Sequence, residues 1–155
     1  MKKSELYNAG SGYVMTATGQ AYWIDFQDVK DDRGRLTAFE VHNHIPFEIK
    51  RLFYVHQVEP GVDRAGHAHR ETDQVLTVVH GTLNVEILDG KTSREYLLTD
   101  PGKGLYVPRM IWIRLHDFSE GAVCLVAANT IYDRSKSIRT WNDFAEARGL
   151  AAKGN

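Results

Sequence analysis

Residues 66–69 of this chain read Gly-His-Ala-His, which places His67 and His69 two positions apart. Successive side chains of a β-strand point to opposite faces, so two residues with this spacing share a face. Two imidazoles on one face can bind a metal ion together, or they can transfer protons near neutral pH. The residues around the pair must distinguish these two roles.

The segment that follows resembles the first half of a cupin metal motif, in which a Glu follows His-x-His by four or five residues. Asp73 or Gln74 stands at that position here. The second half of the motif supplies a further His five residues after a proline, where this chain has Ile113 after Pro108. Two histidines with a weak third ligand and an apolar fourth residue make a poor site for a divalent ion, so we expect no bound metal. A loose site completed by carboxylate or amide oxygens is the alternative.

Proton transfer needs the same geometry but no metal. One histidine can act as a general base because its pKa lies near the operating pH. The second can return the proton, polarise an oxygen or orient the first, and Asp73 or Gln74 can fix the tautomer of a catalytic imidazole. We therefore interpret His67 and His69 as functional residues at the mouth of a barrel rather than as surface or core histidines.

Short alternating apolar segments separated by turn residues predict an all-β fold. Turn signals include Asp31-Asp32-Arg33-Gly34, Asp89-Gly90 and Asp100-Pro101-Gly102. We expect a cupin-type antiparallel β-barrel (jelly roll) with a short C-terminal helix, which Asn142 would cap and Gly149 would end. The expected strands are 22–26, 35–41, 49–58, 66–69, 73–80, 83–88, 94–99, 104–108, 111–117 and 122–128.

The length of 155 residues predicts one domain, which we place at 21–150. Residues 1–20 are polar and small, and are expected to form a flexible N-terminal arm or an extra edge segment. Trp141 and Phe144 should dock the C-terminal helix on the barrel. His42 and His44 form a second His-x-His, but they precede Ile45-Pro46 and are interpreted as surface residues.

Composition excludes several partners. Charged residues make up 25% of the chain and the net charge is −1, so no nucleic-acid partner is expected. Apolar runs are far shorter than the ~20 residues that span a bilayer, so no membrane partner is expected either. Lys2 and Lys3 precede no apolar stretch, so the sequence predicts no secretory signal. Cys124 lies in an apolar run and is expected to be a buried core thiol, which favours a reducing cytoplasm.

Several strings, taken in order, resemble the WxcM-like sugar 3,4-ketoisomerases, a cupin family that acts on dTDP-4-keto-6-deoxyglucose. The resemblance runs from about residue 22 to residue 145. The matching strings are Asp32-Arg33-Gly34, Ile45-Pro46-Phe47-Glu48-Ile49-Lys50-Arg51, Arg64-Ala65-Gly66-His67-Ala68-His69, Gln74-Val75-Leu76, Gly104-Leu105-Tyr106-Val107, Trp112, His116-Asp117-Phe118-Ser119 and Tyr132-Asp133.

This resemblance implies a metal-independent and cofactor-free isomerase that moves a keto group of a dTDP-linked 4-keto-6-deoxy sugar from C4 to C3. It would work in deoxysugar or lipopolysaccharide O-antigen biosynthesis, as a cytoplasmic homodimer that shares an N-terminal strand. By analogy, His69 is the first choice for the base and His67 for the acid, shuttle or orienting partner. The arginines Arg51 and Arg64 would bind the diphosphate through bidentate contacts. Further substrate contacts are expected from Tyr106, Trp112, His116 and Gln74.

The chain departs from the family at two positions. Ile113 follows the tryptophan where relatives have His, and Phe53 replaces a frequent Tyr. These changes could alter the stereochemistry at C4, the substrate or the rate. The alternative function is therefore a non-catalytic or metal-dependent cupin that binds a nucleotide sugar or another small ligand.

Overall fold

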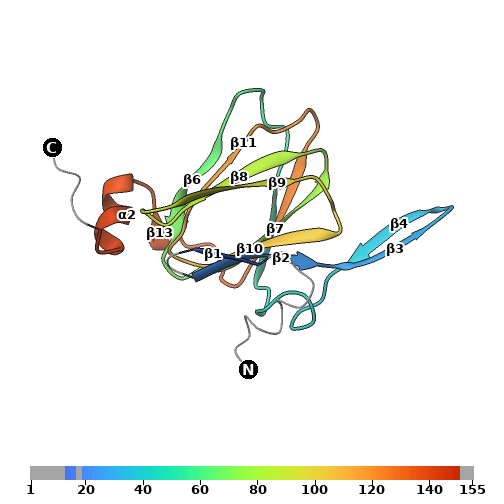
Figure 1. The fold of residues 1–155 in the computed structure, drawn as a ribbon, viewed down its shortest axis with the longest axis horizontal. Helices are drawn as coiled ribbons and strands as arrows, with labels where there is room; N and C mark the ends of the chain where they lie inside the picture. Colours follow the sequence, from blue (N-terminus) through green and yellow to red (C-terminus); the bar gives the residue numbers. More distant parts are fainter. Residues whose placement is uncertain (1–12, 17–18, 151–155) are drawn as a thin grey trace.

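Two antiparallel sheets face each other in a computed structural model that describes residues 13–16 and 19–150, with side chains from Ala21 onward. All pairs between the named strands are antiparallel. One sheet has six strands in the order β1-β2-β10-β7-β12-β5, and the other has five in the order β13-β6-β11-β8-β9. Figure 1 shows the two layers, with helix α2 at one end and the β3–β4 hairpin projecting from the other. The expected cupin-type jelly roll is confirmed.

The strand boundaries agree closely with the alternating pattern. The strands are β1 (Tyr13–Thr16), β2 (Gly19–Asp25), β3 (Gln27–Asp31), β4 (Gly34–Ala38), β5 (Arg51–Val55), β6 (Arg64–His69), β7 (Gln74–His80), β8 (Leu83–Leu88), β9 (Ser93–Leu98), β10 (Lys103–Val107), β11 (Trp112–His116), β12 (Val123–Ala128) and β13 (Ser137–Ile138). A 3₁₀ turn, η1 (Arg134–Lys136), precedes β13, and α2 (Trp141–Ala147) follows it. Strands β3 and β13 were not predicted, because β3 is exposed throughout and β13 has only two residues, so neither alternates.

The main core lies between the sheets. Alternation along β8 and β11 sends Val85, Ile87, Ile113 and Leu115 into it, and all four are buried. Cys124 lies in the same core, which confirms its expected burial, and this burial raises the pKa of its thiol to about 12. Because the interior is filled in this way, the two sheets form a rigid frame for the side chains at its open end.

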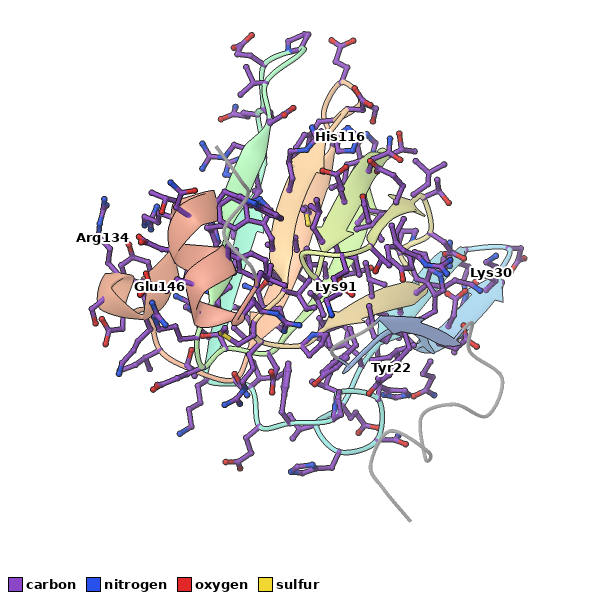
Figure 2. All side chains as sticks on the ribbon, turned by 60° about the vertical axis from the view of Figure 1, so that its left-hand side comes forward. Tyr22, Lys30, Lys91, His116, Arg134 and Glu146 are labelled. Atoms are coloured by element: carbon purple, nitrogen blue, oxygen red, sulfur yellow. The ribbon has the colours of Figure 1, made fainter. Side chains whose placement is uncertain are left out.

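A second apolar cluster covers the outer face of the six-stranded sheet. Its buried members include Tyr22, labelled in Figure 2, and Phe26, with Ile45 and Phe47 from the segment before β5. The segment with Ile45 and Phe47 therefore packs across β2, β7 and β10. Strand β7 is therefore buried on both faces from Gln74 to Val78. Strand β4 ends at Ala38, three residues before the predicted end at residue 41.

Helix α2 packs on one end of the outer face of the five-stranded sheet, beside β13 and the end of β6. Phe144 is fully buried against Ala68 and Ile138, and Trp112 and Trp141 pack on them, which confirms the expected docking of the tail. The predicted cap at Asn142 is wrong. The Thr140 hydroxyl accepts the hydrogen bond from the Asp143 backbone N–H, because Thr140 has the extended backbone that an N-cap needs. None of the helices in the described part of the chain is long and apolar enough to cross a membrane.

Of the N-terminal segment, residues 13–16 pair with β2 as the edge strand β1. Residues 1–12 and 17–18 of the expected arm or edge segment lie outside the described residues. The same holds for Lys2 and Lys3, on which the prediction of no secretory signal was based.

Candidate active site

Strand β6 presents both histidines to the interior. His67 is paired with Ile113 of β11, which points into the main core, whereas Ala68 between the histidines is buried in the outer cluster under α2. A register irregularity interrupts this pairing between Ile113 and Arg114, next to the positive φ values of Ala65 and Gly66. Such a bulge bends the strand end and redirects its side chains. The predicted shared face of the two histidines is therefore present in the fold.

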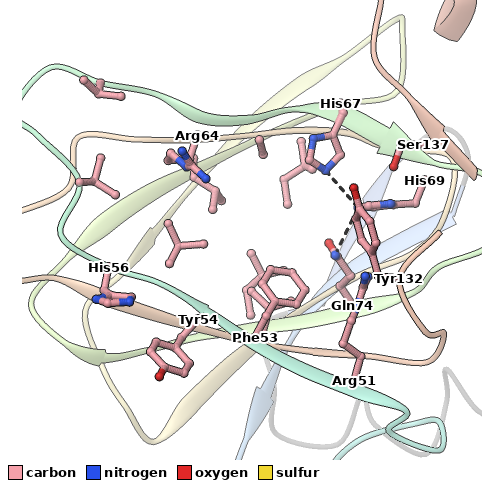
Figure 3. Close-up of a pocket in the computed structure, with 18 of the residues that line it drawn as sticks. Arg51, Phe53, Tyr54, His56, Arg64, His67, His69, Gln74, Tyr132 and Ser137 are labelled. Atoms are coloured by element: carbon pink, nitrogen blue, oxygen red, sulfur yellow. Dashed lines mark hydrogen bonds between the residues drawn. The ribbon is translucent and has the colours of Figure 1, made fainter. Parts of the chain in front are cut away.

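The two imidazoles contact each other. His67 Nε2 lies 3.1 Å from His69 Nε2, and the rings meet edge to face with centroids 4.7 Å apart. One of these nitrogens donates and the other accepts, so the pair shares a proton position. The side-chain amide nitrogen of Gln74 lies 3.3 Å from the same His69 atom, as Figure 3 shows. This amide reaches across from β7 in the opposite sheet and orients the ring of His69.

Burial and nearby positive charge keep both rings neutral. Burial is the main cause that lowers the pKa of His67, followed by the charge of Arg139, while a hydrogen bond with the Ala65 backbone opposes them. Burial again comes first in lowering the pKa of His69 to about 4, followed by His67, Arg51 and Arg139. A neutral imidazole has a free ring nitrogen, so near neutral pH the pair is ready to accept a proton.

The histidines open into a cavity of about 720 Å³ between the sheets. Arg51, Arg64, Phe53 and Ile113 also line it, so six of the positions singled out in the sequence surround one space together with Gln74. In Figure 3, Arg51 lies on the side of Gln74 and His69, whereas Arg64 lies farther along β6. A cavity of this size can hold a sugar with part of its nucleotide.

Arg51 lies between two aromatic rings. Its guanidinium carbon is 5.2 Å from the ring centroid of Phe53 and 5.5 Å from that of Tyr132. Burial lowers its pKa, and its Nε has no hydrogen-bond partner among the described residues. A cation held on aromatic faces at the wall of a cavity can bind an anion there.

Tyr106 and Trp112, two expected substrate contacts, do not line this cavity, so their contact with the substrate stays a prediction. Tyr106 stacks on Tyr22 in the outer cluster of the six-stranded sheet, with centroids 4.7 Å apart. Trp112 packs against Trp141 and Phe144 under the helix. Each is adjacent in its strand to a residue that points inward, so period-two alternation turns its own ring outward.

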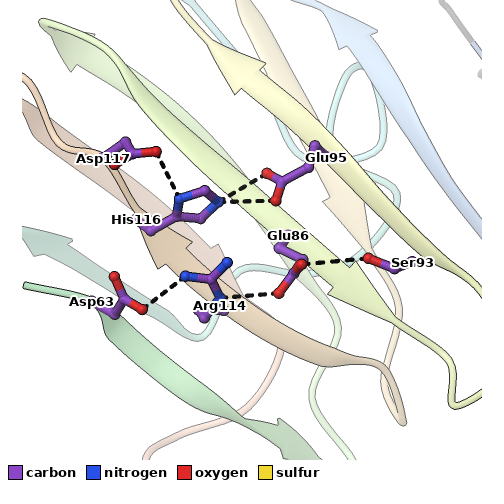
Figure 4. Close-up of polar contacts among 7 residues, drawn as sticks. All are labelled: Asp63, Glu86, Ser93, Glu95, Arg114, His116 and Asp117. Carbon is purple, nitrogen blue, oxygen red and sulfur yellow. Dashed lines mark hydrogen bonds and ion pairs between the residues drawn. The ribbon is translucent and has the colours of Figure 1, made fainter.

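His116, another expected substrate contact, lies on the outer face of β11 and does not line the cavity, so this contact also stays a prediction. Its two ring nitrogens bind the carboxylates of Glu95 and Asp117 at 2.9 Å and 3.0 Å. Nearby on this face, Arg114 pairs with Glu86 and Asp63 (Figure 4). This arrangement is a surface ion-pair network away from the cavity.

The structure separates the roles of Asp73 and Gln74. Asp73 turns away from the cavity and accepts hydrogen bonds from Arg109 and Asn129, whereas Gln74 points at His69. Gln74 therefore occupies the place of the cupin Glu. Among the described residues, no three His, Cys, Asp or Glu side chains lie close enough to hold a metal ion.

Sequence reasoning assigned no role to three cavity residues, Tyr132, Ser137 and Arg139. Ser137 is paired with His69, and Ile138 with Ala68, through the short strand β13. A two-residue strand has no periodicity that a sequence can reveal. Of this part of the cavity wall, the sequence indicated only Tyr132, within the Tyr132-Asp133 string that resembles the family.

With this geometry in place, comparison with known proteins identifies the family. The family model for FdtA, described as WxcM-like, C-terminal, matches residues 19–149. The chain belongs to the WxcM-like family. The match includes β2 to α2 and therefore every residue of the cavity wall, and it confirms the resemblance expected from about residue 22 to residue 145.

WxcM-like relatives are similar to this chain over most of their length. A TDP-4-oxo-6-deoxy-α-D-glucose 3,4-oxoisomerase from Aneurinibacillus thermoaerophilus is 38% identical over 78% of this chain and 87% of its own. The structure of QdtA, a sugar 3,4-ketoisomerase from Thermoanaerobacterium thermosaccharolyticum in complex with TDP, is 32% identical, with a TM-score of 0.81 over 83% of this chain and 94% of QdtA. WlaRB, a TDP-quinovose 3,4-ketoisomerase from Campylobacter jejuni, is 34% identical, with a TM-score of 0.77 over 81% and 97% of the two chains.

Proposed function

We propose that this protein is a nucleotide-sugar 3,4-ketoisomerase that converts a TDP-linked 4-keto-6-deoxyhexose to its 3-keto isomer. One observation carries the proposal: two neutral histidines in contact at 3.1 Å line a cavity whose walls also hold Arg51 and Arg64. The relatives named above act on TDP-linked sugars, which supports this substrate class. The 3-keto product fits a place in deoxysugar biosynthesis, including that of lipopolysaccharide O-antigens.

The reaction moves two hydrogens and no heavy atoms. A base removes the proton from C3, the C3–H electron pair forms a C3=C4 double bond, and the C4 carbonyl π pair moves onto its oxygen. The resulting enediolate takes up a proton on its C4 oxygen. The enediol then loses the proton of its C3 hydroxyl while C4 takes up a proton, so that C3 becomes the carbonyl and C4 carries the hydroxyl. Neutral His69 is our first choice for the base, and the contact with His67 gives the abstracted proton a second nitrogen to occupy.

Gln74 takes part by holding His69. It is 5% exposed, and its amide lies against the Nε2 of His69. An amide can satisfy either tautomer of the ring, because it carries both a donor and an acceptor. We assign it the role of positioning the base through the reaction.

Arg51 and Arg64 are proposed to bind the diphosphate. Both arginines line the cavity, and Arg64 stands at the start of β6. Guanidinium groups suit this role because they contact two phosphate oxygens at once. Arg51 also neighbours the base, which would place the sugar between the diphosphate and the histidines.

A homodimer is proposed as the working form. Leu52 and Tyr54 on the outer face of the edge strand β5 are 57% and 62% exposed, and Val79 of β7 extends this apolar area. Large exposed apolar side chains on one sheet, here on β5 and β7 with β12 between them, are typical of interfaces. Light scattering should give twice the mass of one chain, and Leu52→Glu, which changes a residue outside the cavity, should shift it toward the mass of a monomer.

Proton NMR of the purified protein with TDP-4-keto-6-deoxyglucose in deuterated buffer tests the function. The expected result is a 3-keto product with solvent deuterium at the carbon that is reprotonated, and the coupling constants give its configuration at C4 despite the departures at Ile113 and Phe53. Binding of TDP-sugars with no exchange at C3 would instead favour a non-catalytic cupin. Activity that chelation removes, together with stoichiometric metal by elemental analysis, would favour the metal-dependent alternative.

A further inference from the structure

Arg139 is placed beside the histidine pair by the short strand β13. This strand runs antiparallel to β6, with Ser137 opposite His69 and Ile138 opposite Ala68. The next residue, Arg139, therefore follows toward His67. Ile138 is buried in the outer cluster, so alternation directs Ser137 and Arg139 to the cavity side, and both line the cavity.

The guanidinium of Arg139 has no ion-pair partner among the described residues. Other arginines of the fold are neutralised: Arg109 pairs with Asp73, and Arg114 with Asp63 and Glu86. The charge of Arg139 is near enough to both imidazoles to disfavour their protonation. An unpaired cation beside two neutral bases on a cavity wall is arranged for an anion.

The proposed reaction offers two anions. One is the diphosphate, which Arg51 and Arg64 already account for. The other is the enediolate, whose negative charge appears on the C4 oxygen as the base takes the C3 proton. Because the base is one of the two histidines, this charge develops next to the dyad, where Arg139 lies.

We propose that Arg139 binds the C4 oxygen of the sugar and stabilises the enediolate. This inference rests on the proposed function. It gives the site a hydrogen-bond donor for the negative C4 oxygen, a role that neither the histidines nor Arg51 and Arg64 fill. The guanidinium stays protonated throughout: it donates hydrogen bonds to the C4 oxygen as the C4=O π pair moves there, until that oxygen takes up its proton to give the enediol. It gains and loses no proton.

Replacing this donor should lower the rate without loosening the nucleotide. Arg139→Gln is expected to reduce kcat by about 100-fold, the scale for removal of one oxyanion donor, while the dissociation constant of TDP measured by calorimetry stays unchanged. Arg139→Lys should recover part of kcat because it restores the charge but not the fork. Arg134→Gln is the matched control, since Arg134 is an exposed arginine of the same connection outside the cavity, and its kcat should equal that of the wild type.

A pH profile separates this role from a structural one. Arg139→Gln removes a positive charge near His67 and His69, so their pKa values rise, and the limb of kcat/KM that increases with pH moves to higher pH. The other titratable or charged groups of the cavity stay in place and keep their influence; these are Arg51, Tyr54, His56, Glu59, Arg64 and Tyr132. A merely structural residue would not move this limb.

The outcomes distinguish the two proposals. If the wild type exchanges C3–H and Arg139→Gln does so at the same rate, the inference about Arg139 is wrong and the ketoisomerase stands. If Arg139→Gln binds TDP more weakly with kcat intact, Arg139 is a phosphate ligand and the inference is again wrong. If the wild type shows no exchange, the proposed function fails, and the role of Arg139 fails with it.

Discussion

Gln74 of β7 lies 3.3 Å from Nε2 of His69 on β6, and this contact joins the two sheets inside the cavity. The amide and His67 Nε2 approach the same nitrogen of His69, so that nitrogen has polar neighbours from its own strand and from the opposite layer. Two such contacts define the orientation of the ring. The geometry of the base thus depends on how the sheets pack.

Gln74→Glu should shift the pH dependence of activity. A carboxylate next to His69 favours the imidazolium form, so the pKa of His69 rises and the rising limb of kcat/KM moves to higher pH. Gln74→Leu should leave that limb near its wild-type position and lower kcat by about tenfold, because the ring loses a neighbour that orients it. Identical pH profiles for wild type and Gln74→Glu would contradict the contact.

The two histidines should differ in their effect on C3–H exchange. His69→Asn is expected to keep the fold and to reduce exchange by about 100- to 10,000-fold, the range for loss of a general base. His67→Asn should retain more exchange, because the base remains. Exchange is followed by NMR in deuterated buffer, and circular dichroism checks the fold. If the order of the two variants is reversed, His67 is the base.

Folding stability should fall as the pH drops from about 6.5 to about 4. Both histidines have pKa values lowered by burial, so the unfolded chain binds protons in this window that the folded chain does not. Above the histidine pKa of the unfolded chain, the folded and unfolded states bind the same number of protons, so the histidines have no effect on the free energy of unfolding there. For His69 the loss reaches at most about 3 kcal/mol at the acid end. Urea unfolding at several pH values measures it, and a His67→Asn, His69→Asn double variant should show a smaller slope.

Arg51→Lys should weaken TDP binding by roughly tenfold, because a lysine cannot form the bidentate contact or lie between the rings of Phe53 and Tyr132. Calorimetry with TDP measures the change. Arg134→Lys provides the control, as its side chain lies outside the cavity. Equal affinities for wild type and Arg51→Lys would remove Arg51 from the diphosphate site.

Phe144→Ala should lower the free energy of unfolding by about 3–5 kcal/mol, since it leaves a cavity under the helix where the ring is fully buried. Glu146→Ala on the same helix should cost far less, because Glu146 is exposed. Denaturant unfolding of both variants tests this. A small effect of Phe144→Ala would mean that α2 is only loosely docked.

Much of this fold could be predicted from the alternation of apolar and polar residues, because a strand with one buried face shows that alternation in its sequence. That same pattern shows that His67 and His69 share a face. It does not say which face of a strand is inside when both faces are apolar, as with Trp112 and Ile113 on β11. Tyr106 and Trp112 were therefore expected in the cavity, whereas Ile113 is the residue that lines it.

Residues brought in by long connections were harder to foresee. Arg139 and Ser137 reach the site through two hydrogen-bonded residues, and their position depends on pairing with β6. Gln74 could be predicted because it lies close to the His-x-His motif in the sequence, at the place of the cupin Glu. Ser137 and Arg139 could not, because they lie far from that motif along the chain.

Strand β13 has a consequence for how the molecule avoids association. Without it, β6 would be the outermost strand of its sheet, and its free backbone N–H and C=O groups would be a template for another chain. Two residues are enough to occupy these groups beside His69 and Ala68. Strand β13 thus shields β6 from intermolecular β-pairing. Changes that remove the pairing of β13 with β6 are expected to cause aggregation first.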